Sequence, residues 1–191
     1  MDVFTAIRER RSCRNFLPDE PGGDLVERVL EAGNWAPSPA NRQPWEFVVI
    51  RNPAVKEQIY REGMLCKQKL LERSGWKWLD SYHIDFIREV PVVIAVIGDP
   101  QKSGADLFLD EGTGRGYLEA CSAAIQNMML AAHALGLGSL WFTLFEPASL
   151  RKTLGLDPGK DPVGLVCIGK CAGGPAPAKR KEPGEKTRYL D

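Results

Sequence analysis

The sequence contains few of the motifs with which proteins carry out chemistry unaided. It has only two histidines, His83 and His133, so a histidine-based triad or metal site has few candidate residues. The patterns G-x-x-x-x-G-K-S/T, G-x-S-x-G and H-E-x-x-H are missing, and "EGTGRGY" (111–117) does not fit G-x-G-x-x-G. His133 falls in an apolar helical stretch, where a hydrogen-bonded core histidine is the usual case. We therefore expect any catalysis to depend on a bound cofactor.

The chain also lacks net charge and a membrane-spanning run. Its 25 Lys and Arg residues equal its 25 Asp and Glu residues, so the overall field that non-specific nucleic-acid binding needs is missing. The longest apolar stretch, 120–138, contains Gln126 and Asn127, which a lipid-facing span would rarely tolerate. We expect neither a nucleic-acid nor a membrane partner, and any anion must be held by a local cluster of cations.

Cysteine usage gives no sign of a disulfide framework or a metal site. The five cysteines form no C-x-x-C pair, and the start "MDVFTAIRER" has neither the apolar run nor the cleavage site of a secretory signal. Cys167 and Cys171 are close in sequence, but a strand would separate their Cα atoms by about 13 Å, so they should neither bridge nor share a metal. We expect a cytoplasmic protein with reduced cysteines.

Hydrophobic periodicity predicts helices alternating with strands up to residue 171, whereas the tail from Ala172 has too little apolar material to pack as an element. Helices are expected at 3–11, at 25–35 with Asp24 as its cap, at 117–135 and after Pro147, with an interrupted helical region from 53 to 90. Strands are expected at 45–50, 92–98, 140–144 and 162–169, the second of them buried on both faces. The pattern favours an α/β or α+β sandwich with helices covering a central sheet.

Two basic clusters stand near opposite ends of the chain. "RRSCRNF" contributes Arg10, Arg11, Ser12 and Arg14, and guanidinium forks match the oxygens of a phosphate monoester. "AKRKEP" (178–183) adds three consecutive cations. Taken singly, the first is more often a solvated helix end and the second a solubilising surface run. Together they could hold one anion.

The segment "APSPANRQPW" (36–45) cannot continue a helix because its three prolines remove donors and restrict their neighbours. Its polar groups, including Ser38, Asn41 and Gln43, are free to hydrogen-bond a flat heterocycle. The alternative is an ordinary proline-rich connector. Its place directly before a core-like strand favours a functional loop.

Two further segments allow both a structural and a functional interpretation. "GLGSLW" (136–141) could let a ligand approach the backbone closely, although glycines most often simply end a helix. In 75–86, the helical spacing of Trp78, Tyr82 and Phe86 predicts a core-facing stripe. The alternative there is an aromatic lid over a planar substrate.

In the order "ERRSCRNF", "APSPANRQPWEFVVI", "AIQNMMLAAHALGLGSLWF" and "VGLVCIGKCAGGPAPAKRK", the sequence resembles the nitroreductase family of FMN-dependent oxidoreductases. The resemblance implies a single α+β domain over 1–191, a three-layer sandwich with a mostly antiparallel central sheet and a variable lid within 51–88. It also implies an interlocked homodimer with FMN in two interface pockets. The long apolar helix suits the middle of such an interface.

The resemblance also implies roles for particular residues. Arg10 and Ser12 would hold the FMN phosphate, Arg14 would lie near the ribityl chain or the pyrimidine edge, and Arg11 would also belong to the cofactor site. The loop around the isoalloxazine would consist of Pro37, Ser38, Pro39, Asn41 and the supporting Gln43. Backbone groups near the flavin would come from Ser139, Leu140 and Trp141, and the substrate lid from Trp76, Trp78 and Tyr82. The tail departs from the family pattern by an extra glutamate, so the phosphate cation is Arg180 or Lys181, with Lys179 as a helper and Arg180 preferred.

The implied reaction is ping-pong electron transfer. NADH or NADPH would reduce the flavin at N5, and a small electron-poor acceptor such as a nitroaromatic or quinone would be reduced in turn, with no catalytic side chain required. Two alternatives remain open. One is a specialised relative resembling dehalogenating or flavin-cleaving enzymes, and the other is a flavin-binding protein without turnover.

Overall fold

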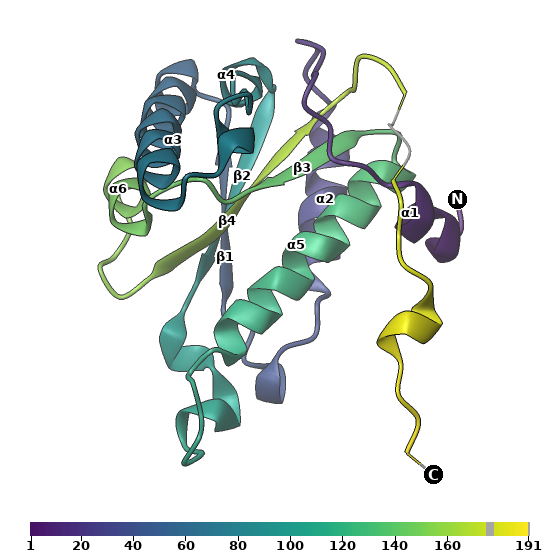
Figure 1. Ribbon diagram of the computed structural model, residues 1–191, viewed down its shortest axis with the longest axis vertical. Coiled ribbons are helices and arrows are strands. Elements are labelled where there is room, and N and C mark those ends of the chain that lie inside the picture. Colours follow the sequence, from purple (N-terminus) through teal and green to yellow (C-terminus); the bar gives the residue numbers. More distant parts are fainter. Residues whose placement is uncertain (175–177, 191) are drawn as a thin grey trace.

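The computed structural model describes residues 1–174 and 178–190, and its centre is a four-stranded antiparallel sheet (Figure 1). The strands are β1 (Trp45–Ile50), β2 (Val92–Gly98), β3 (Gly138–Phe142) and β4 (Asp161–Gly169), in the order β1-β2-β4-β3. Each neighbouring pair is antiparallel. The four predicted strands are confirmed, although β3 begins at Gly138, two residues before the predicted start.

Helices cover both faces of this sheet, as the α+β sandwich prediction requires. The helices are α1 (Val3–Glu9), α2 (Gly23–Asn34), α3 (Pro53–Ser74), α4 (Phe86–Glu89), α5 (Gly116–Ala134) and α6 (Pro147–Thr153). In Figure 1, α3, α4 and α6 lie on one side of the sheet, and α1, α2 and α5 on the other. The predicted three-layer α+β architecture is therefore confirmed.

Strand β2 shows why the sheet is covered on both faces. All seven of its residues are buried. Val93, Ala95 and Ile97 point into the core under α3, α4 and α6, whereas Val92, Ile94 and Val96 point toward α2 and α5. This is the two-residue alternation of a strand whose two faces are both apolar.

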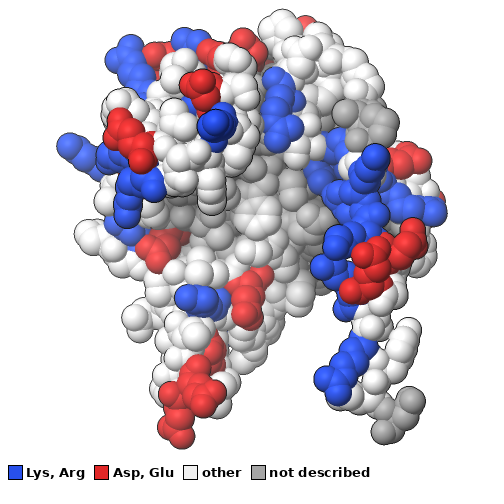
Figure 2. Space-filling view, in the orientation of Figure 1, with Lys and Arg blue, Asp and Glu red and all other residues white. Residues whose placement is uncertain are grey.

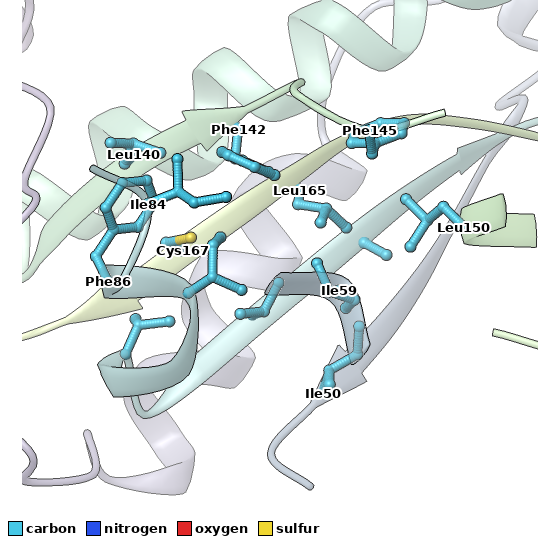
Figure 3. Packing of buried hydrophobic residues seen from close by; sticks show 14 of the residues in the cluster. Ile50, Ile59, Ile84, Phe86, Leu140, Phe142, Phe145, Leu150, Leu165 and Cys167 are labelled. Atoms are coloured by element: carbon cyan, nitrogen blue, oxygen red, sulfur yellow. The ribbon is translucent and has the colours of Figure 1, made fainter. Parts of the chain in front are cut away.

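The core under α3, α4 and α6 joins side chains that are far apart in sequence (Figure 3). Ile59 of α3 and Leu150 of α6 are fully buried there. Phe86 of α4 meets Phe142 of β3 edge to face, with ring centroids 5.9 Å apart, a geometry that aromatic pairs favour. The interrupted helical region of the sequence is thus fastened to the sheet through α3 and α4.

The core on the other face depends on close packing of α2 against α5. A Cβ atom at Gly33 would lie 2.8 Å from Met128 Cγ, so only glycine allows the two helices this approach. Asp24 does not cap α2, contrary to expectation, because the helix begins at Gly23 and Gly22 takes the cap position without a side-chain hydrogen bond. Among the described helices, none is both long enough and apolar enough to cross a membrane.

An extended segment after α1 joins the end of the sheet. Ser12 forms an isolated bridge with Ser139, and Phe16 forms one with Cys171 just beyond β4. This pairing brings Cys13 to Cys171, and the two form a disulfide with Cα atoms 6.1 Å apart. The expectation of reduced cysteines was wrong for this pair, because only the overall path of the chain brings residues so distant in sequence together. Cys167, by contrast, is a free buried thiol, as the strand geometry predicted.

Candidate functional site

The first basic cluster lies where the ends of α1, β3 and β4 meet. Helix α1 ends at Glu9, and Arg10 takes its C-cap position with an extended backbone. The N–H of Cys13 then donates to the Ser139 carbonyl at 2.9 Å, and the N–H of Leu17 donates to the Lys170 carbonyl at 2.8 Å. The segment that carries the cluster is therefore fixed to the sheet by main-chain hydrogen bonds.

A cavity of about 660 Å³ opens at this meeting point. Three stretches of chain line most of it: the segment after α1, the turn from α5 into β3, and the chain after β4. Their charged and polar lining side chains are Arg10, Arg11, Ser12, Arg14, Asn15, His133, Ser139 and Lys170. The disulfide cysteines Cys13 and Cys171 also belong to the wall.

Three side chains of this cavity carry buried polar atoms that have no hydrogen-bond partner within residues 1–174 and 178–190. They are Arg10 Nη1, His133 Nε2 and Ser139 Oγ. A buried donor left unpaired costs about 1–3 kcal/mol, so proteins seldom keep several of them at one place without a ligand. His133 was expected to be a hydrogen-bonded core histidine, and that expectation was wrong.

The second basic cluster approaches the first. Burial lowers the pKa of Arg10, and the positive charges of Arg11 and Arg180 lower it further. Arg180 of the tail thus acts on Arg10 through its charge, although the cavity lining includes Arg10 and not Arg180. In Figure 2, Lys and Arg side chains gather on the side of the molecule where α1 and the tail lie. Repelling guanidinium groups at one place favour an anion between them.

The other cations of the two clusters have different surroundings. Arg11 Nη1 donates to the carbonyls of Arg8 and Arg10 at 2.6 and 2.8 Å, so it helps to close the last turn of α1. Lys181 pairs with Glu185 at 3.8 Å within the tail. Lys179 is exposed, and its carbonyl accepts from Arg180 Nη1. The stretch "VGLVCIGKCAGGPAPAKRK" (163–181), which precedes and includes these cations, also contains residues 175–177, which lie outside the described part of the chain.

The aromatic segment after α3 matches the predicted core-facing stripe only in part: Phe86 is buried and Tyr82 packs against the same core, but Trp78 is exposed and forms a surface cluster with Trp76. Trp76 and Trp78 stack with ring centroids 6.1 Å apart, and Tyr82 meets Trp78 edge to face at 5.7 Å. Both tryptophans are more than half exposed. The helical spacing misled for Trp78 because the chain between Gly75 and Asp85 forms only a 3-10 turn, and the next α-helix, α4, begins at Phe86. The Arg14 guanidinium lies over the Tyr82 ring at 5.7 Å, so this cluster borders the basic segment.

The proline loop is a tight, internally bonded turn. Ser38 Oγ accepts from the Gln43 N–H at 3.0 Å, and Gln43 Nε2 donates to both the carbonyl and the side-chain oxygen of Asn41. Ala40, Asn41 and Gln43 all have positive φ, which is uncommon outside glycine and recurs at functional sites. Pro37 precedes this turn, and Pro39 opens its short 3-10 helix.

Within a single copy of this protein, the proline loop does not reach the basic cavity. Pro39 packs near Gly116, the first residue of α5, whereas His133 in the last turn of α5 lines the cavity. Helix α5 has 19 residues, which corresponds to a length of about 28 Å. The two motifs therefore lie at opposite ends of this helix, farther apart than a five-carbon ribityl chain reaches.

The β3 residues predicted to approach a flavin have three different environments. The Ser139 carbonyl accepts from the Cys13 N–H, and the residue lines the cavity, while its buried side-chain oxygen has no described partner. Leu140 is buried in the core under α3 and α4. Trp141 points to the α5 side, where its buried Nε1 has no described partner. The sequence did not identify His133 and Lys170 as cavity residues. The only available signal was that each is a polar residue near the end of an apolar helix or strand.

Comparison with known proteins agrees with this architecture. A sequence model described as "Nitroreductase family" matches residues 7–170. A curated relative from Methanothermobacter thermautotrophicus, named as a candidate NADH dehydrogenase/NAD(P)H nitroreductase, is 31% identical over 144 residues, covering 74% of this chain and 60% of the relative. This chain thus spans less than two thirds of that protein's length.

Two other proteins match over more of their length. The 5,6-dimethylbenzimidazole synthase of Rhodospirillum rubrum is 28% identical, covering 84% of this chain and 77% of the synthase. The crystal structure of a candidate nitroreductase from Desulfovibrio desulfuricans in complex with FMN is 28% identical, with a TM-score of 0.76 and coverage of 100% of this chain and 98% of that one. On these matches and on its fold, this chain belongs to the nitroreductase family.

Proposed function

We propose that this protein is an FMN-dependent oxidoreductase that takes electrons from NADH or NADPH and passes them, in a ping-pong cycle, to an electron-poor acceptor such as a nitroaromatic or a quinone. The observation that carries the proposal is the cavity in which Arg10 and Ser139 present buried, unpartnered donors while Arg180 approaches from the other end of the chain. The FMN complex of the Desulfovibrio desulfuricans relative supports the choice of cofactor.

The residues present fit the phosphate group of FMN. Arg10 offers a guanidinium nitrogen that lacks a described partner, Ser12 lines the same cavity, and Arg180 adds positive charge from the tail. Charge-assisted hydrogen bonds of this kind are about twice as strong as neutral ones. We therefore assign the phosphate to Arg10, Ser12 and Arg180. Lys181 is the weaker candidate because it pairs with Glu185.

We infer that a second copy of this chain completes the site. The proline loop lies at the far end of α5, so the isoalloxazine ring beside one cavity would have to meet the loop of another copy. Exposed apolar side chains support an interface around α1 and the end of α2: Phe4 is 70% exposed and Trp35 is 79% exposed. Large exposed apolar side chains mark surfaces that bind proteins, and these two stand close in sequence to the basic cluster and to the proline loop, the two motifs that a second copy would bring together.

The protein's own residues would then bind and orient, and none of them would act as a nucleophile. When bound, FMN supplies the ring that accepts electrons from the nicotinamide and releases them to the acceptor. Arg14 borders both the cavity and the aromatic cluster, so it is the cation we expect near the ribityl chain or the pyrimidine edge. A cation at that edge would stabilise the negative charge that develops on reduction.

We propose that Trp76, Trp78 and Tyr82 form a lid over the acceptor. Their stacked and edge-to-face contacts make an exposed aromatic cluster beside Arg14, and a planar acceptor can stack on an exposed ring of this kind. In this proposal, residues 1–191 form one domain with a lid within 51–88. We further propose a cytoplasmic location, where nicotinamide cofactors are available.

A specialised flavin reaction is the second candidate, and the likeness to the 5,6-dimethylbenzimidazole synthase of Rhodospirillum rubrum is the observation that favours it. One assay separates the candidates. Purified protein is loaded with FMN, reduced with NADH or NADPH under anaerobic conditions, and then mixed with a nitroaromatic or a quinone. The proposal expects the yellow colour to bleach and then to return with stoichiometric reduction of the acceptor.

Other outcomes of this assay contradict the proposal in distinct ways. Bound flavin that no nicotinamide reduces would point to a binding protein without turnover. Loss of the flavin itself on reoxidation, with formation of a benzimidazole, would favour the specialised reaction. Colourless protein that takes up no FMN would exclude all three.

A further inference from the structure

His133 lies at a junction of three elements of the basic cavity. It belongs to the last turn of α5, against which α1 packs, and Arg10 follows directly at the end of α1. Ser139 is on β3, three residues after the Gly136 turn, and its side chain points to the same face of the sheet as α5, since Leu137 and Trp141 pack in the core on that face. The three side chains therefore converge from a helix end, a second helix end and a strand.

The unpaired atoms of the described residues are concentrated here. Five buried side-chain nitrogen or oxygen atoms lack a partner within residues 1–174 and 178–190, and three of them belong to Arg10, His133 and Ser139. The other two, on Glu62 and Trp141, are not on the lining of this cavity. Random imperfections would be scattered through the core, whereas a cluster at one cavity indicates a missing ligand.

The chemistry of the three groups restricts that ligand. A guanidinium only donates, a hydroxyl can donate, and an imidazole donates from Nε2 when that nitrogen carries the proton. The lining also includes Lys170, so the cavity wall is cationic. A group with several acceptor oxygens and a negative charge satisfies all of these donors at once. Among parts of FMN, this describes the terminal phosphate and neither the ribityl hydroxyls nor the ring.

We propose that His133 binds the terminal phosphate of FMN by donating a hydrogen bond from Nε2, beside Arg10 and Ser139. The inference rests on the proposed function, because it takes FMN as the ligand. It adds a phosphate ligand from α5 that the two basic clusters do not include. It also gives His133 a measurable role: the side chain discriminates FMN from riboflavin, which has the same ring and ribityl chain but no phosphate.

The test compares the affinities of both flavins for flavin-free protein by quenching of flavin fluorescence. His133→Leu removes the donor and keeps an apolar side chain of similar size. Because a hydrogen bond to a charged group contributes about 1.5–3 kcal/mol, we expect the Kd for FMN to rise about tenfold or more and the Kd for riboflavin to change less than about twofold. His83→Leu, the same change at the exposed histidine, should alter neither.

A second measurement uses the unmodified protein and does not depend on how the variant folds. Diethyl pyrocarbonate acylates either imidazole nitrogen; His133 is partly exposed although its Nε2 is buried, and peptide mass spectrometry distinguishes it from His83. FMN and inorganic phosphate should both protect His133, riboflavin should not, and His83 should react in every case.

The outcomes separate this inference from the function on which it depends. If the protein binds no FMN, the proposed function fails and the inference fails with it. If FMN binds but His133→Leu leaves the ratio of FMN to riboflavin affinity unchanged, only the inference is overturned. Protection of His133 by riboflavin as strong as that by FMN would also overturn it, because the ring and not the phosphate would then lie there.

Discussion

Replacing Arg10 should separate the contribution of the buried cation from that of the tail. Arg10 is half-buried, follows a helix and lines the cavity, and its buried Nη1 has no described partner. A hydrogen bond between charged groups in such a place contributes about 1.5–3 kcal/mol, so Arg10→Ala should raise the Kd for FMN by about 10- to 140-fold.

The same change at Arg180 should have a smaller effect. Arg180 lies on an exposed tail, and its guanidinium donates within the tail to the Lys179 carbonyl. Exposed ion pairs contribute about 0.2–1 kcal/mol and weaken with salt, so Arg180→Ala should raise the Kd by about 1.5- to 5-fold. The effect of Arg180→Ala should also shrink as salt is added, whereas that of Arg10→Ala should persist.

The stability of the flavin-free protein gives a second, independent reading. In the absence of the anion, Arg10 is partly desolvated and repelled by Arg11 and Arg180. Removing it should therefore leave the free energy of unfolding within about 1 kcal/mol of the wild-type value. If Arg10 were needed for the fold, its removal would instead lower the free energy of unfolding both with and without bound flavin.

The assay is fluorescence titration with FMN at two salt concentrations, together with urea unfolding of the flavin-free proteins. Arg28→Ala, at an exposed position on α2, is the matched control and should bind FMN normally. Equal losses of FMN affinity in the Arg10 and Arg180 variants would refute the reasoning, as would a large loss of stability without flavin in Arg10→Ala.

Three further predictions concern the fold and the lid. Reduction, or Cys171→Ala, should lower the free energy of unfolding by about 2–5 kcal/mol in urea titrations, and reductant should have no further effect on the Cys171 variant. Gly33→Ala should cost about 1–3 kcal/mol because its Cβ would crowd Met128 and Phe47, whereas Gly23→Ala, with open space around it, should not; equal effects would contradict the close α2–α5 packing. Trp78→Ala should raise the KM for a planar acceptor in steady-state assays while flavin content stays unchanged, and a loss of bound flavin would argue against a lid.

Local signals in the sequence predicted most of the fold. The strands at 45–50 and 92–98 were predicted with the correct ends because prolines precede them and β-branched residues fill them. The start of β3 was missed because Gly138 was interpreted as part of a helix stop. In the structure Gly138 is a strand residue without a side chain because a Cβ there would lie 2.9 Å from Cys13 Cβ and would also meet the sulfur of Cys171.

The parts of the site that escaped prediction depend on contacts between distant segments. Nothing in the residues around Cys13 indicates a partner 158 positions away. The role of His133 was hidden because an apolar helix surrounds it in sequence, although its last turn opens onto the cavity. Trp78 was misassigned to the core because a helical spacing was extended over 75–85, which forms only a 3-10 turn between α3 and α4.

The disulfide turns residues 13–171 into a covalent ring that contains every strand of the sheet. Arg10 and Arg180 lie on the two short arms outside this ring. Exopeptidases that shorten those arms would remove the anion-holding cations while the enclosed sheet stayed linked end to end. Removal of residues from both termini would thus lower the affinity for an anion without any cleavage between residues 13 and 171.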